Sequence, residues 1–392
     1  MIVRQFISWV RTASAGERAD ATRALARAWL ISDLTEDDRA AAEGALLMML
    51  DDPSPLVRQA MAEVFSRHDD APVAIVRALS VDQPSVALPI LECSPLLIDA
   101  DLVDIVATGG VDIQCAIARR IDLAAPVCAA LAEVGHPRAV LELIENVLAD
   151  VPEFSLARIV ERHGHLAAIR ETLLARDDLP ATCRLALAAK LSETLTQFTV
   201  ARAWLNANRA DHLAGEARER ATVTIAATLR GEDLVGLVAH LRQSGQLSAG
   251  LILRALLCGN FELFSEALTQ LSGLPPARVA ALLDDRSGSG VAALLQRAGL
   301  PVSTRPAFRA AMEASYEIGF AGTPGGAARL RRSMVERVLT RCETDPAIEE
   351  GPLLTLLRRF ATEAAREEAR LFCDDLAAEA AVARDADDRI AA

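Results

Sequence analysis

Three groups of residues in this sequence have the side chains that chemistry commonly uses: adjacent carboxylates, a close histidine pair and a run of arginines. The carboxylates are Asp51 and Asp52, in the stretch LDDPSPLVRQAMAEVF. Two carboxyl groups can act as general acid and base when both face one reacting bond. Adjacent residues of a helix do not share a face, however, and neither carboxylate has an acid or base partner nearby in sequence. We therefore predict that this pair lies at a turn that ends a helix.

Metal ligands are not suggested by the histidines or the cysteines. His163 and His165 form the only close histidine pair, whereas two ligands on one helix favour i, i+4 spacing, as in His-Glu-x-x-His. The seven cysteines are widely spaced and form no C-x-x-C motif, so paired zinc ligands are missing. We predict no metal site and no cofactor, and we interpret most cysteines as buried, reduced thiols of a cytoplasmic protein.

Signatures of nucleotide hydrolysis and of nucleophilic catalysis are also missing. The chain has one lysine, Lys190, and no Gly-Lys pair, so the phosphate-binding loop that requires Gly-Lys-Ser/Thr is absent. No Gly-x-Ser-x-Gly motif occurs, and the stretch SGSGV at 287–291 follows no strand pattern. We therefore expect that the protein is not an enzyme.

The most suggestive polar feature is an arginine cluster, which places five guanidinium groups within the 13 residues 329–341 of a chain with net charge −13. Such groups can bind a phosphate, a nucleotide-like ligand or an acidic partner. Alternatively, they lie on a solvated helix and pair with neighbouring acids, such as Glu336. The members of the arginine cluster are Arg329, Arg331, Arg332, Arg337 and Arg341.

The overall composition favours helices and excludes several classes of function. Apolar residues make up 52% of the chain and aromatic residues only 4%, with Ala and Leu, both good helix formers, in the majority. The net charge of −13 disfavours binding to nucleic acid through phosphates. No apolar run approaches the 18 residues that a membrane span needs, and Arg4 interrupts the apolar N-terminus, so we expect neither a span nor a signal peptide.

The stretch LDDPSPLVRQAMAEVF predicts the joint between two helices. Ser54 can cap a helix, and Pro55 can occupy its first position, where no N–H donor is needed. Val57, Met61 and Val64 then follow at i, i+4 and i+7, which is one face of a helix. A connection this short makes the two helices antiparallel neighbours.

The pattern recurs and indicates a repeat protein. In VDQPSVALPIL, an aspartate and a proline repeat the motif thirty residues later, and similar alternations of turn and helix follow at spacings of roughly 25 to 40 residues. Units of two short helices expose apolar surface that only neighbouring units can cover, so they stack. The positions that we assign to the repeat itself are Asp52, Pro53, Val57, Asp82 and Pro84.

Two resemblances support this interpretation. The spacing of Asp52, Val57 and Arg58 resembles the HEAT repeat, in which the Asp and Arg commonly pair along a ladder of repeats. A longer series over residues 35–320 resembles the alphaproteobacterial domain-of-unknown-function family 2336, which implies a HEAT-like helical array and supplies no catalytic residues. That series contains LDDPSPLVRQAMAEVF, ALSVDQPSVALPILECSPLLIDADLVDIV, AIARR, LSAGLILRALLCGNFELFSEAL, GLPPARVAALL and GLPVSTRPAFRAAMEASYE.

We divide the chain into four segments. N-terminal helices occupy 1–45, a HEAT-like repeat array 46–230, and a less regular helical continuation 231–320. The stretch GFAGTPGGAARL at 319–330 is the strongest helix breaker, and after it C-terminal helices with a frayed tail occupy 321–392.

The predicted fold class is all-α, an α-solenoid of irregular HEAT-like helical hairpins with a C-terminal helical region. Because such arrays present long surfaces for binding, we expect a non-enzymatic scaffold or adaptor that binds a partner protein, with Arg58 and the arginine cluster as candidate contacts. The alternative is a regulatory sensor of a small, nucleotide-like anion that binds to the arginine cluster. The sequence leaves the partner and the oligomeric state open.

Overall fold

The computed structural model describes residues 6, 8–285, 288–318, 326–345 and 351–391. No strand occurs in these parts of the chain, which confirms the predicted all-α class. The chain divides into two compact units, residues 1–194 and 195–392. This division lies inside the segment 46–230, for which the sequence predicts one array. Most of the breaker stretch predicted as a boundary, residues 319–325, lies outside the described residues.

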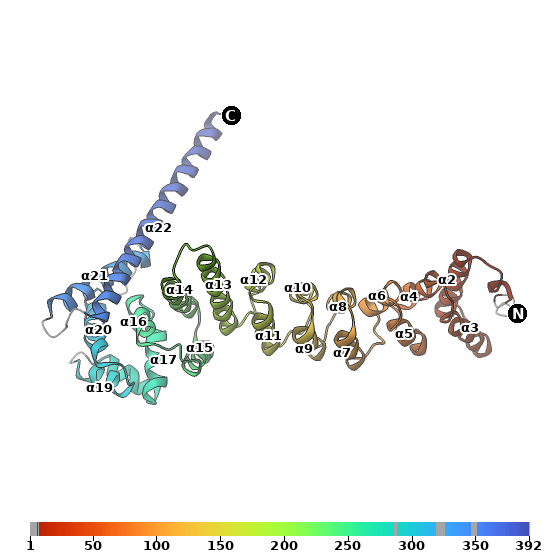
Figure 1. The fold of residues 1–392 in the computed structure, drawn as a ribbon, viewed down its shortest axis with the longest axis horizontal. Helices are drawn as coiled ribbons and strands as arrows, with labels where there is room; N and C mark the ends of the chain where they lie inside the picture. The colour runs from red at the N-terminus through yellow and green to blue at the C-terminus, as the bar shows by residue number, and fades with distance from the viewer. Residues whose placement is uncertain (1–5, 7, 286–287, 319–325, 346–350, 392) are drawn as a thin grey trace. The chain divides into compact units, whose positions relative to one another are not determined.

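The first unit is a stack of short helices in two layers, drawn in red to green in Figure 1. In one layer α2, α4, α6, α8, α10 and α12 each pack on the next member, and in the other α7 packs on α9 and α9 on α11. This arrangement is an all-α, repeat-like stack of helices. The helices are α2 (Ala15–Ile31), α3 (Glu36–Met49), α4 (Pro55–Phe65), α5 (Val73–Ser80), α6 (Pro84–Cys93), α7 (Asp99–Thr108), α8 (Val111–Ala118), α9 (Ala125–Val134), α10 (Pro137–Glu145), α11 (Glu153–His163), α12 (Ala167–Leu174) and α13 (Ala181–Ala201).

The joint predicted at residues 50–65 is present. Helix α3 ends at Met49, the two aspartates form the turn, and Pro55 is the first residue of α4. Ser54 occupies the N-cap position, but its hydroxyl makes no capping hydrogen bond. Its backbone N–H instead donates to Oδ1 of Asp52 at 2.9 Å, so the carboxylate organises the turn. Val57 is fully buried, as its place on the apolar face predicts.

Arginine–aspartate pairs join successive hairpins at this edge of the first unit. Arg18 of α2 holds Asp52 through Nε and Nη2, at 2.7 and 2.9 Å. Arg58 of α4 holds Asp82, before α6, in the same bidentate way, and its Nη1 donates to the Asp52 carbonyl. Each arginine therefore binds the aspartate of the following hairpin, and the ladder has two such rungs. Hydrogen bonds with arginine lower the pKa values of the Asp52 and Asp82 carboxyl groups below the ordinary value.

At the opposite edge the hairpins are joined by side chains that donate to helix ends. The last carbonyls of a helix have no partner within it and carry the negative end of the helix dipole. Arg120, after α8, donates to the carbonyls of Leu91 and Ser94 at the end of α6, both at 2.7 Å. Asn146, after α10, donates to two carbonyls at the end of α8, at 2.9 and 2.8 Å. Arg176, after α12, donates to a carbonyl at the end of α10 at 2.9 Å.

The second unit surrounds the short helix α16, which is buried from Leu251 to Leu257. It packs on α14, α17, α20 and α21, and α21 packs on the long α22. The helices are α14 (Ala207–Thr228), α15 (Gly231–Gln243), α16 (Ala249–Leu257), α17 (Phe261–Ser272), α18 (Pro276–Leu283), α19 (Ser289–Arg297), a 3₁₀ turn (Val302–Thr304), α20 (Arg305–Ile318), α21 (Gly326–Thr344) and α22 (Pro352–Ala391).

Helix α22 continues to Ala391, through most of the tail that the sequence predicts to be frayed. Among the described residues, no helix combines the length and the apolar character that crossing a membrane requires.

Replacing Asp82 with Asn should lower the free energy of unfolding by about 1.5–3 kcal/mol, because it breaks a charged, largely buried bidentate pair. Urea unfolding followed by circular dichroism measures the change. The matched control is Asp112→Asn, whose pair with Arg138 leaves side chains 65% and 59% exposed. That variant should lose less than about 0.5 kcal/mol. Equal losses in the two variants would contradict the structural role of the ladder.

The stability that the Asp82 pair provides should disappear in acid. A carboxyl group whose pKa is lower in the folded protein stabilises it fully above the unfolded pKa, about 4, and this stability is lost as the pH falls through the folded pKa. The stability difference between the wild-type protein and Asp82→Asn should therefore be constant from about pH 7 to 5 and shrink below about pH 4. Urea midpoints measured across this range test the sign, and a difference that grows in acid would refute it.

Candidate functional site

Exposed apolar side chains occur at successive loops along one edge of the first unit. We call the loops that follow α6, α8, α10 and α12 the loop edge, namely residues 94–98, 119–124, 146–152 and 175–180. Ile98, Ile121 and Val147 are 55%, 74% and 88% exposed. Leu148, beside Val147, is also exposed. An apolar residue in contact with water thus recurs in three consecutive loops.

Carboxylates accompany these apolar residues on the loop edge. Asp122 and Asp150 are exposed and lie in the same loops as Ile121 and Val147, and Asp99, directly after Ile98, is exposed as well. Asp122 has a φ of 55°, in the left-handed region that aspartate tolerates better than most residues. The edge therefore presents acidic and apolar groups side by side.

The backbone beneath the loop edge is held in place by the contacts that join the hairpins. The donors Arg120 and Asn146 each connect one loop of the edge to the preceding helix end. In addition, the Asp150 N–H donates to the Leu123 carbonyl at 2.9 Å, which ties two successive loops directly. A surface with this degree of backbone hydrogen bonding is preorganised for binding.

The predicted repeat positions lie in the hairpin joints. Val57 is buried, Pro84 is at the start of α6, and Asp52 and Asp82 form the rungs described above. Arg58 also lies in these joints. Its guanidinium group pairs with Asp82, and its side chain is only 15% exposed. The structure thus places this predicted partner contact inside a joint, at the edge opposite to the loop edge.

The histidine pair does not converge on one site. His163, the last residue of α11, is buried, and desolvation lowers the pKa of its imidazole, whereas His165 is exposed. Within the described residues, no group of three or more His, Cys, Asp or Glu side chains is arranged to hold a metal ion.

The arginine cluster lies on α21, and four of its five members pair with glutamates. These pairs point to several directions around the helix, so the five guanidinium groups do not form one receptor, and Arg329 is exposed. Only Arg331 reaches the cavity described next. The partners are Glu367 for Arg331, Glu336 and Glu368 for Arg332, Glu317 for Arg337, and Glu313 and Glu317 for Arg341.

A cavity of about 550 Å³ opens between α14, α16, α21 and α22 of the second unit. Six arginines and three glutamates line it. Five of the arginines lie outside the arginine cluster and were not predicted as site residues. A signal was present on α22, where arginine and glutamate alternate at helical spacing along one face. The arginines are Arg220, Arg254, Arg331, Arg359, Arg366 and Arg370.

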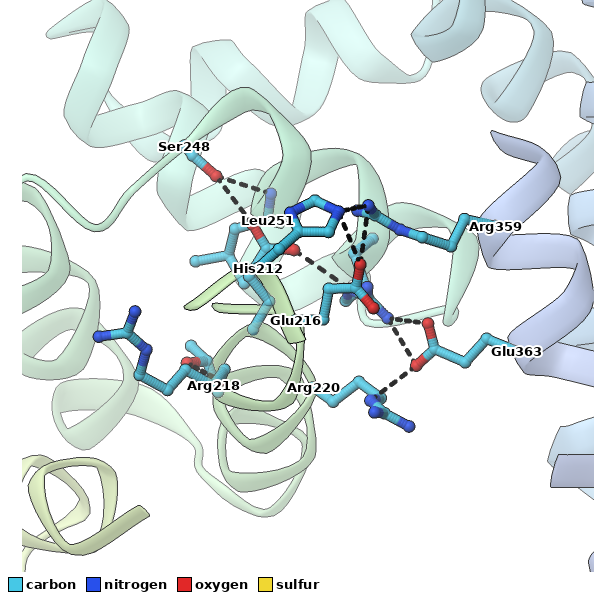
Figure 2. A network of polar contacts seen from close by, with 11 residues as sticks. His212, Glu216, Arg218, Arg220, Ser248, Leu251, Arg359 and Glu363 are labelled. Atoms are coloured by element: carbon cyan, nitrogen blue, oxygen red, sulfur yellow. Dashed lines mark hydrogen bonds and ion pairs between the residues drawn. The ribbon is translucent and has the colours of Figure 1, made fainter. Parts of the chain in front are cut away.

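Two glutamates organise the polar wall of this cavity (Figure 2). Glu363 of α22 accepts from Nη1 of Arg254 with both oxygens, at 2.9 Å, and pairs with Nε of Arg220 at 2.9 Å. Glu216 of α14 lies 2.7 Å from Nη1 of Arg359, which also contacts His212. These contacts connect α22 to α14 and α16.

Cys258 is the cysteine that lines the cavity. Burial raises the pKa of its thiol, although Arg331 and Arg254 act in the opposite direction. The group therefore stays protonated at neutral pH, and a protonated thiol is a weak nucleophile. The chemistry that this wall offers is recognition of negative charge by guanidinium groups.

One family profile matches the chain, over residues 86–346: DUF2336, described as an uncharacterised protein conserved in bacteria. The chain belongs to DUF2336. This confirms the family predicted from the sequence, over a range that begins and ends later than the predicted 35–320. No curated protein and no solved structure matches the chain. The DUF2336 match includes the loop edge and three of the four helices around the cavity, and it ends before α22.

Proposed function

We propose that this DUF2336 protein is a non-enzymatic adaptor that binds a partner protein along the loop edge of its first unit. The observation that supports the proposal is the row formed by Ile98, Ile121 and Val147, which are exposed in three consecutive loops of the loop edge. The exposed part of an apolar side chain contributes nothing to folding, but it gains roughly 25 cal/mol for each Å² that a partner buries.

The spacing of this row describes the partner's binding segment. Ile121 and Val147 directly follow the equivalent donors Arg120 and Asn146. Packed helices lie about 8–10 Å apart, so these equivalent residues of successive hairpins are separated by roughly that distance. An α-helix advances about 10 Å in seven residues, and an extended strand does so in three. The partner segment should therefore repeat an apolar residue at one of these intervals.

The carboxylates of the loop edge add a charge requirement. Asp99, Asp122 and Asp150 stand beside the apolar row and are exposed. Positive side chains on a partner complement such a surface and accelerate its association. We infer a partner segment that carries basic residues beside its repeated apolar residues.

A second candidate function, binding of a small anionic ligand, was associated with the arginine cluster in the sequence. The arginine-lined cavity of the second unit favours it at a different position.

Replacing Ile121 and Val147 together with Ser should reduce capture of the partner by about tenfold or more, because two central apolar contacts are removed. The assay is affinity purification of the full chain from its native cell extract, with quantitative mass spectrometry of bound proteins. The matched control is Val81→Ser, because Val81 is 74% exposed, the same fraction as Ile121, but lies at the opposite edge.

The adaptor proposal requires proteins that are retained by the wild-type chain and by Val81→Ser and lost from the double variant. Circular dichroism of all three chains verifies that each is folded. If the same proteins are recovered from all three, or if Val81→Ser alone loses them, the loop edge is not the binding surface.

A further inference from the structure

We propose that the cavity of the second unit binds a small phosphorylated molecule whose remaining part is compact and apolar or planar, of the size of a mononucleotide. This is a ligand site in a different part of the chain from the loop edge. It does not depend on the adaptor function, and each can fail without the other.

The wall of the cavity carries an excess of positive charge. Six arginines line the cavity and only three glutamates do, in a protein whose overall charge is −13. Each glutamate forms ion pairs, Glu363 with Arg254 and Arg220, Glu216 with Arg359, and Glu367 with Arg331, although Oε1 of Glu216 accepts no hydrogen bond. Arg366 and Arg370 add further positive charge from an exposed position on α22. An excess of positive charge in a concave site attracts anions.

The wall also contains a buried guanidinium group with unused hydrogen-bond donors. Arg254 of α16 is only 4% exposed. Its Nη2 makes no hydrogen bond, and its Nε lies 3.5 Å from Glu219 without hydrogen-bond geometry. The Nε atoms of Arg331 and Arg359 are also buried without a hydrogen-bond acceptor. Leaving donors of buried charged groups unsatisfied is costly, so a site with several of them is suited to an added acceptor.

The orientation of Arg254 is set before any ligand arrives. Its Nη1 is held by Glu363, and its Cζ lies 4.3 Å from the ring centroid of Phe360, so the guanidinium group stacks on an aromatic face. A guanidinium group held in this way is preorganised for a tetrahedral oxyanion, because its planar fork matches two phosphate oxygens.

The remainder of the cavity lining is largely apolar. Beside the arginines lie apolar side chains, namely Leu213, Val223, Leu257, Val335 and Phe360. A free inorganic anion would leave this surface in contact with water. The volume of about 550 Å³ lies within the usual range of about 300–1,000 Å³ for small-molecule pockets. Charge and apolar surface together favour an organic phosphate over an inorganic one.

The test is isothermal titration calorimetry of the full chain at constant ionic strength with four probes: adenosine 5′-monophosphate, guanosine 5′-monophosphate, adenosine and inorganic phosphate. At least one nucleotide should bind with a Kd below about 1 mM. Adenosine and inorganic phosphate should each bind at least about tenfold more weakly, since each lacks one half of the recognised chemistry.

Three variants locate the binding. Arg359→Gln and Arg370→Gln change the wall without touching the buried α16, and each should weaken nucleotide binding by about fivefold or more. Arg254→Met should abolish binding, provided that circular dichroism shows a folded chain. Arg230→Gln is the matched control, because Arg230 is an exposed arginine of the same unit that pairs with Glu262 away from the cavity. It should bind like the wild type.

Several results would overturn the proposal. It fails if neither nucleotide binds the wild-type chain, or if inorganic phosphate or adenosine binds as tightly as the better nucleotide. It also fails if Arg359→Gln and Arg370→Gln both leave the affinity unchanged, or if Arg230→Gln weakens binding as much as they do, since that result indicates nonspecific attraction.

Discussion

The first unit depends on one constraint: helices of eight to eleven residues, such as α8 and α11, are marginal on their own. Each exposes an apolar face and unpaired carbonyls at its end. Packing against the next hairpin covers the face, and side chains such as Arg120 and Asn146 supply donors for the carbonyls. Because every hairpin relies on its neighbours in this way, the repeats are stable only as a stack.

The same constraint gives the two edges of the stack different characters. At one edge Arg58 and Asp82 are occupied with each other, so charged residues that look available in the sequence are committed to stability. At the other edge Arg120, Asn146 and Arg176 donate to backbone carbonyls. Ile121 and Val147 take no part in these contacts and face water. The loop edge, where apolar groups are exposed, is therefore the edge that supports the proposed adaptor function.

In the second unit the governing interaction is the burial of Arg254. Placing a guanidinium group at 4% exposure requires compensation, and Glu363 and the ring of Phe360 provide part of it. Apolar residues of similar volume would commonly serve stability equally well. A buried charge with an unused donor, facing a cavity, is easier to explain as a device for recognition than as a contribution to folding.

The sequence by itself determined the helical class, the family and the joints between hairpins, because capping residues, prolines and apolar spacing act locally, as at Pro55 and Val57. The resemblance to the HEAT repeat also implied that aspartates and arginines such as Asp52 and Arg58 pair along a ladder of repeats, and the structure shows the partners, Arg18 with Asp52 and Arg58 with Asp82. Only the tertiary structure could decide which arginines meet. Arg254 and Glu363 are 109 residues apart, and no local pattern brings them together. Their contact arises from the packing of α16 and α22 in three dimensions, where distance along the chain no longer matters.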